Sequence, residues 1–263
     1  MAYITSLNDY LAAPKQHISL YRADVTTSVA NIPQLVHQSH GSPGLISWYK
    51  SSTSAMTTSG IASDGIFVPV LATTGNLTSF SFHSTVAARG ALYDLHGYAG
   101  TYTIPANVSG ITGGPISTPV TLNSLPHYNT QLWVSIVTAT TGSMLSANIT
   151  YTNQDGVAGR VTGVQTGTSI VGSCFRMPLQ AGDTGVRSIQ AVTSSAATGG
   201  AFNILILREL VITPPINIIN TLTKYNLIDL GLPPVTNASA LLPMVISGTT
   251  QTGRSTFEIE ISG

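Results

Sequence analysis

The stretch MPLQAGDTGVRSIQAV, residues 177–192, gathers residue types that could bind an anion. Gly182 and Gly185 bracket an Asp and a Thr, and Arg187 follows shortly after. A phosphate-binding loop needs a Gly-rich turn that opens a helix, and a P-loop adds a Lys followed by Ser or Thr. This stretch lacks that Lys, and Asp183 places a negative charge where the anion would bind. We therefore expect a turn between two strands, with Arg187 paired either to Asp183 or to a neighbouring subunit.

Histidine and cysteine residues show no spacing typical of a metal or nucleophilic site. His37 and His40 lie three residues apart, which would suit metal ligands on a helix, but Pro33 and Pro43 flank them. The single cysteine, Cys174, lies among apolar residues, as a buried and unreactive thiol does. The sequence therefore predicts no catalytic, metal-binding or cofactor-binding residue, and no cofactor.

Acidic and aromatic residues leave two other chemistries open. Glycoside hydrolysis needs two carboxylates across a cleft. The candidates in the central region are Asp64, Asp94, Asp155 and Asp183. The last two fall in predicted turns, so a hydrolase ranks behind the other functions. The aromatic run YDLHGYAGTY, residues 93–102, could contact a sugar, although its strand-like pattern favours core packing and predicts a buried His96.

Low charge is the main feature of the composition. Charged residues make up 8% of the 263 residues, with ten basic and ten acidic side chains, whereas an ordinary domain has about 25%. No basic stripe is present to neutralise phosphates, so we expect no nucleic-acid partner. The most apolar segment, FNILILRELVITPPINII, is interrupted by charges and prolines, so we expect no membrane span. The N-terminal residues lack the pattern of a signal peptide. A neutral surface of this kind favours association.

Alternating apolar and polar residues dominate the chain. In LSANITYT, residues 145–152, apolar residues and Tyr occupy one face and Ser, Asn and Thr the other, and NQDG follows as a hairpin signal. STFEIEIS, residues 255–262, alternates in the same way. Short strands between frequent turns predict an all-β fold, an antiparallel, jelly-roll-like β-sandwich.

Three segments can be distinguished. Residues 1–43 are expected to form an extended N-terminal arm with a short helix, capped at Ser6 and ended by Pro14. Residues 44–210 would form the sandwich. Residues 211–263 would be an extended, Pro-rich connection followed by strands that complete or flank the sandwich.

Several motifs together resemble a family of tailed-bacteriophage virion proteins. They are, in chain order, ITSLNDYLAAPKQ, LYDLHGYAGTY, QLWVSIVTATTG, ITYTNQDGVAGR, MPLQAGDTGVRSIQAV with GGAFNILILREL, and LGLPPVTNASALLPMVIS with FEIEIS. The resemblance covers most of the chain and implies a structural role in the phage particle. It supplies no catalytic residue.

The expectation that follows is a capsid decoration protein and not an enzyme. It would bind the major capsid protein on the outer surface of the head, self-associate as a homotrimer, and be assembled in the host cytoplasm. The expected capsid anchors on the arm are Tyr3, Ile4, Leu7, Tyr10 and Leu11. Asp183 and Arg187 are the expected subunit contact. A tail, neck, baseplate or fibre protein that binds host glycan is the alternative, and a virion-associated glycan hydrolase is the third possibility.

Overall fold

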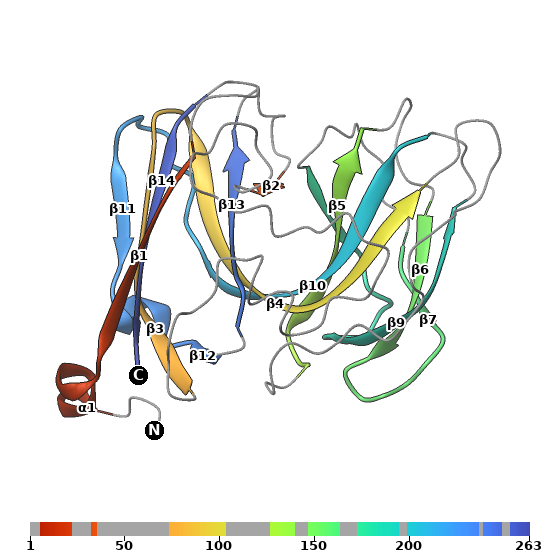
Figure 1. Cartoon of the computed structure of the whole chain (residues 1–263), viewed down its shortest axis with the longest axis horizontal. Coiled ribbons are helices and arrows are strands. Elements are labelled where there is room, and N and C mark those ends of the chain that lie inside the picture. Colours follow the sequence, from red (N-terminus) through yellow and green to blue (C-terminus); the bar gives the residue numbers. More distant parts are fainter. Residues whose placement is uncertain are drawn as a thin grey trace. The chain divides into compact units, whose positions relative to one another are not determined.

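The computed structural model describes residues 6–22, 33–35, 74–103, 127–139, 147–163, 173–194, 199–236, 239–248 and 253–263. The elements, labelled in Figure 1, are α1 Leu7–Ala12, β1 Lys15–Arg22, β2 Pro33–Leu35, β3 Thr74–Ser84, β4 Ala88–Thr103, β5 Thr130–Thr138, β6 Ala147–Asn153, β7 Arg160–Val161, β8 Cys174–Met177, β9 Val186–Ser194, β10 Ala201–Ile212, β11 Leu222–Tyr225, α3 Leu227–Leu230, β12 Pro234–Thr236, β13 Leu241–Ser247 and β14 Ser255–Ser262. Strands dominate, and their pairing is antiparallel. The predicted all-β, antiparallel sandwich is confirmed.

The described residues divide into two compact units. The first unit holds those up to Asp94 and those from Glu209 onward, and the second holds those within Leu95–Arg208. These bounds fall inside β4 and β10, so each unit contains its own part of both strands. The three segments expected from the sequence have other bounds and stay a prediction.

The first unit has its core between two sheets. One sheet has the order β1-β14-β3-β11, with β12 also paired to β3, and the other includes β13 and the first part of β4. The alternation predicted for β14 holds, since Phe257 and Ile261 are fully buried. The Phe257 ring lies 5.0 Å from that of Phe82 on β3. Burying one such side chain stabilises the fold by about 1.5–3 kcal/mol.

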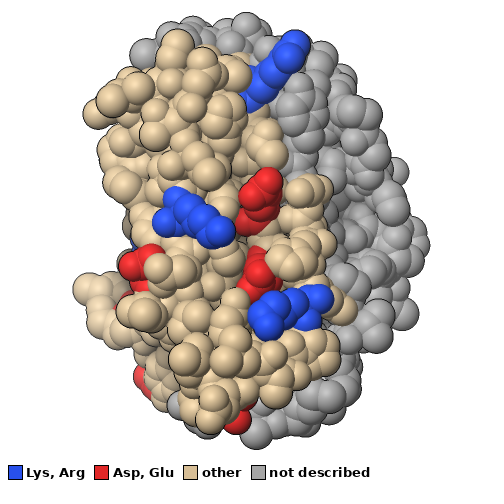
Figure 2. Space-filling view, turned by 90° about the vertical axis from the view of Figure 1, so that its left-hand side faces the viewer, with Lys and Arg blue, Asp and Glu red and all other residues tan. Residues whose placement is uncertain are grey.

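The opposite face of the β1-β14-β3-β11 sheet is polar. Glu260 and Glu258 point outward from β14, and they lie beside His17 and Ser19 of β1 in the antiparallel register. Figure 2, which views the side of the molecule where β1, β14 and β11 lie, shows acidic and basic side chains scattered singly among uncharged ones. No continuous area of one charge is visible on this face.

The N-terminal segment is partly a strand of this sheet. β1 pairs along its whole length with β14, from Lys15 opposite Ser262 to Arg22 opposite Ser255. The predicted helix is confirmed as α1. Its cap is Ser6, whose hydroxyl oxygen accepts a hydrogen bond from the Asp9 backbone N–H at 3.2 Å, and it ends before Pro14.

The connection after β10 is more structured than its prolines suggested. An irregular, extended segment was expected here, and the structure instead forms β11, α3 and β12. Asn226 caps α3 in a capping box with Asp229, and Gly231 ends it in the left-handed region at φ 63°. The Asn226 and Asp229 side chains satisfy backbone N–H groups at the start of this single turn, which a short helix cannot pair internally. At its end, the Gly231 backbone N–H donates to the Ile228 carbonyl.

The second unit contains the three-stranded sheet β7-β6-β9 together with β5, β8 and its own parts of β4 and β10. Thr130, at the start of β5, donates to the Val186 carbonyl and accepts from the Val186 N–H, at the start of β9. Tyr102 and Phe202 stack with their ring centroids 5.5 Å apart. The loop between β8 and β9 is the stretch on which the sequence analysis began.

Candidate functional site

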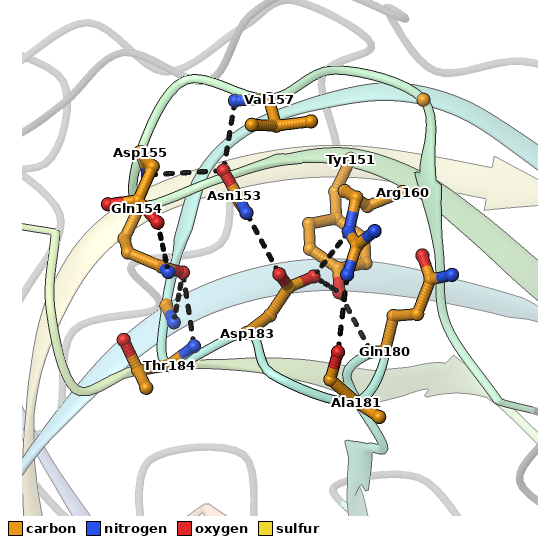
Figure 3. Close-up of polar contacts among 12 residues, drawn as sticks. Tyr151, Asn153, Gln154, Asp155, Val157, Arg160, Gln180, Ala181, Asp183 and Thr184 are labelled. Carbon is orange, nitrogen blue, oxygen red and sulfur yellow. Dashed lines mark hydrogen bonds and ion pairs between the residues drawn. The ribbon is translucent and has the colours of Figure 1, made fainter.

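Asp183 is the centre of a polar network that joins two loops of the second unit (Figure 3). Its Oδ2 accepts hydrogen bonds from Arg160 Nε at 2.9 Å and from the Tyr151 hydroxyl at 2.5 Å. Its Oδ1 accepts from Asn153 Nδ2 at 2.8 Å. The Asp183 side chain is only 3% exposed. The loop between β8 and β9 is therefore fastened to the β6–β7 hairpin through one buried carboxylate.

The network fixes the charge of Asp183. Burial alone would raise the pKa of this carboxyl, but the hydrogen bonds from Arg160, Asn153 and Tyr151 outweigh it and lower the pKa to about 2. Burial, followed by the hydrogen bond to Asp183, raises the pKa of Tyr151 to about 12. At neutral pH the centre is thus a carboxylate whose two oxygens both accept hydrogen bonds.

Gln154 makes a second connection between the same loops. Its side-chain oxygen accepts hydrogen bonds from the backbone N–H groups of Thr184 and Gly185, at 3.1 and 3.0 Å. The backbone at Gly185 runs so close to the His127 carbonyl oxygen that a Cβ there would collide with it. Gly182 has φ 90°, which favours glycine. Both glycines therefore serve the backbone path, and the predicted turn between two strands is confirmed, since β9 and not a helix follows.

The partner of Asp183 differs from the one considered in sequence. Arg160, 23 residues earlier in the chain, makes the ion pair. Arg187 is exposed on β9 and points elsewhere, with its Nη1 near Gly156. The ion pair that the structure describes for Asp183 is therefore with Arg160 of the β6–β7 hairpin, in place of the Arg187 partner considered within the loop. The intersubunit contact of Asp183 and Arg187 stays a prediction.

Sequence reasoning missed the other members of this network. Tyr151 and Asn153 continue the apolar face of β6, where Ile149 precedes them. An Asn at a buried strand position requires hydrogen-bond partners. The position of Asn153 in the strand pattern was therefore the feature of the sequence that could have indicated a polar network. No feature of the sequence indicated that Arg160, which is distant in the chain, would join the network.

The remaining polar candidates lie in the interior. Cys174 is fully buried in β8, as expected. Asp94 is also fully buried and accepts a hydrogen bond from the Ser239 hydroxyl at 3.0 Å. His96 is buried in β4, and burial, followed by the charge of Arg208, lowers its pKa to about 3. His37, His40 and Asp64 lie outside the described residues. None of the three buried groups is accessible to a substrate from solvent.

The aromatic run is mostly core. Tyr93 is 2% exposed and Tyr102 is 1% exposed, so neither ring is available to stack on a sugar. Within the described ranges, no three His, Cys, Asp or Glu side chains come together as a metal site would require. No described helix is long and apolar enough to cross a membrane.

The expected arm anchors divide into three groups. Tyr3 and Ile4 lie outside the described residues. Leu7 and Leu11 are 64% and 65% exposed on α1. Tyr10 points to the protein instead, and its hydroxyl donates to Glu260 Oε1 at 3.0 Å. This geometry fastens the helix on one side and exposes its two leucines.

Comparisons with known proteins leave the family of the chain unassigned. No family model and no curated protein matches it. Among solved structures, the D431N mutant VP2 protein of infectious bursal disease virus in T=1 particles is similar at TM-score 0.19 and 8% identity, covering 95% of this chain and 78% of that one. A VP2 subviral particle of the same virus gives TM-score 0.18 and 9% identity, covering 95% and 81%. The resemblance to tailed-phage virion proteins stays a prediction.

Proposed function

We propose that this chain is a virion structural protein that decorates the outer surface of a phage capsid by binding the major capsid protein. Self-association as a homotrimer and assembly in the host cytoplasm belong to the same proposal, which assigns no catalytic residue or cofactor. The observation that carries it is the exposed leucine pair on α1. The proposed partner comes from the resemblance of the sequence motifs to those of tailed-bacteriophage virion proteins, which stays a prediction.

Helix α1 has the features of a docking element. It has six residues and buries none of them, although an isolated helix of this length is unstable in water. Leu7 and Leu11 are four residues apart, so they share one face. The helix is tied to the first unit through Tyr10, whose ring also lies 4.5 Å from Lys15 Nζ. We take this apolar pair, presented by a fastened helix, as the contact that a partner covers.

A single helix is too small to make the whole interface. A stable, specific interface buries about 800 Å² on each partner, which is more than two leucines provide. The segment from β10 to α3 exposes further apolar side chains, namely Ile218 at 74%, Ile219 at 56%, Leu222 at 56% and Ile228 at 82%. We assign this segment, which lies in the Pro-rich connection after β10, as the second contact. Apolar contacts also suit a particle that meets varying salt, because salt screens ion pairs.

The test replaces both leucines by aspartate, in the variant Leu7→Asp/Leu11→Asp. Point changes are preferable to deleting the arm, because β1 pairs with β14 and its loss would remove a strand of the sheet. Burying each leucine contributes about 1.5–3 kcal/mol, so binding to capsids that lack this chain should weaken roughly a hundredfold or more. Co-sedimentation with capsids that lack this chain measures the change in binding affinity.

The control is Val157→Asp/Val161→Asp, which charges two exposed apolar residues of the second unit, 52% and 42% exposed. It should bind capsids as the unchanged protein does. Circular dichroism must show that both variants are folded. Full capsid binding by a folded Leu7→Asp/Leu11→Asp protein would rule out the proposed contact.

A further inference from the structure

An open groove of about 640 Å³ lies beside the loop between β8 and β9 in the second unit. Its lining residues come from the start of β5, from β8 and from the loop itself. The Asn129 N–H donates to the Thr184 carbonyl at 2.8 Å, which closes one end. The volume is within the range of small-ligand sites, about 300–1,000 Å³.

The groove collects polar side chains that still have hydrogen-bonding capacity. The Gln131 side-chain oxygen accepts from Trp133 Nε1, and this hydrogen bond does not use its NH₂ group. Within the described parts of the chain, no hydrogen bond engages the side chains of Asn129, Arg176, Gln180 and Thr184, all of them exposed lining residues. Figure 3 shows Gln180 and Thr184 beside the network, with no dashed line to the side-chain amide of Gln180 or to the hydroxyl of Thr184.

The charged side chains of the groove lining are Arg176 and Asp183. Arg176 contributes a guanidinium that makes no ion pair with any described residue. Asp183, the one carboxylate of the lining, is 3% exposed and already paired with Arg160. A carboxylate ligand would therefore meet an available bidentate donor and no exposed negative charge.

The wall of the groove is held rigid before any ligand arrives. Five hydrogen bonds fasten the loop to the β6–β7 hairpin: the Asp183 carboxylate accepts three from hairpin side chains, and the Gln154 side-chain oxygen accepts two from backbone N–H groups of the loop. A rigid wall avoids the free-energy cost of ordering a mobile loop when the ligand binds. This saving matters most for ligands that water solvates well, since they gain little net binding free energy from each hydrogen bond. Sugars are such ligands.

We propose that this groove binds an acidic polysaccharide, a chain of sugars that carry carboxylates. Arg176 takes the carboxylate, and the amides of Asn129, Gln131 and Gln180 take the hydroxyls, since an amide can both donate and accept. An acidic peptide could place the same carboxylate on Arg176, but it lacks the rows of hydroxyls that the three amides of the lining could bind, and this favours a sugar chain. The site is separate from α1 and does not depend on the capsid contact.

Calorimetric titration of the full chain tests this with oligogalacturonate, oligomannuronate and hyaluronan oligomers. At least one uronate oligomer should bind, and neutral maltohexaose should bind more weakly. Arg176→Gln should weaken uronate binding by roughly tenfold or more, because a charge-assisted contact is lost. Arg187→Gln is the matched control, since it removes an exposed arginine of the same unit that does not line the groove.

Three results would overturn the assignment. They are no binding of any uronate oligomer, equal weakening in Arg176→Gln and Arg187→Gln, and tighter binding of hexaglutamate than of the uronates. The last would identify an acidic peptide as the ligand. Thermal melts of both variants exclude a folding defect, and capsid binding should be unchanged in Arg176→Gln.

Discussion

The Asp183 carboxylate links ionisation to stability at a single residue. Three side chains donate to it, from β6 and β7, and its pKa is lowered to about 2 from an ordinary value of 3.8. A carboxyl whose pKa is lower in the folded state stabilises that state at every pH above its unfolded value. That stabilisation is lost as the pH falls from about 4 towards 2.

The expected result is an acid-sensitive second unit. At neutral pH the shift corresponds to about 2 kcal/mol of unfolding free energy, since one pKa unit is about 1.4 kcal/mol. Asp183→Asn should lose about this much at pH 7 and show a flatter dependence of unfolding free energy between pH 4 and 2. Urea unfolding followed at several pH values measures both.

Asp155→Asn is the control for that change. Asp155 is exposed on the turn beside the network, where it accepts from Tyr128 and Gln154. This variant should keep the acid dependence of the unchanged protein. An Asp183→Asn protein with the same loss of stability between pH 4 and 2 as the unchanged protein would show that the network is not its source.

Residue roles could be predicted from sequence only where they depend on local pattern. The glycines of the β8–β9 loop and the burial of Cys174 follow from neighbours in the chain. The Asp183–Arg160 pair spans two strands and a turn, so nothing near Asp183 in sequence points to it. The groove around Arg176 is likewise lined by residues of β5 and of the loop after β8, which are distant in the chain, so the sequence could not indicate it.

At the scale of elements, strands were predictable and short capped turns were not. A strand such as β14 repeats its burial every second residue, and that period can be read directly. α3 has a single turn, too short to show a helical stripe. Its signals were Asn226, Asp229 and Gly231, a capping box followed by a left-handed glycine, in a segment whose prolines suggested an irregular connection.

Helix α1 should depend on one tyrosine for its attachment. Tyr10→Phe removes the hydrogen bond to Glu260 and keeps the ring beside Lys15. One hydrogen bond contributes about 1 kcal/mol, so hydrogen exchange of the α1 amides should speed up roughly fivefold. Exchange mass spectrometry of the peptide containing α1 measures this.

The matched control is Tyr128→Phe, which removes another hydrogen bond from a tyrosine to a carboxylate, that of Asp155 in the second unit. It should leave exchange in α1 unchanged. If exchange in α1 is also unchanged in Tyr10→Phe, then pairing of β1 with β14 holds the helix by itself.

At the scale of the whole molecule, the account rests on surfaces made of neutral and apolar groups. The chain has a net charge of zero, and Figure 2 shows acidic and basic side chains intermixed among uncharged ones on the described part of the outer face of the β1-β14-β3-β11 sheet. Such a surface provides little electrostatic repulsion between copies. It favours a protein held among neighbours, with α1 and the segment from β10 to α3 as its contacts.

The position of the chain on a phage particle tests this claim most directly. Cryo-electron microscopy of a particle that carries the chain should show it in hundreds of copies on the outside of the head, with Leu7 and Leu11 of α1 covered by the major capsid protein. Density confined to the tail, neck or baseplate in a few copies, or a head contact that leaves α1 uncovered, would contradict the account.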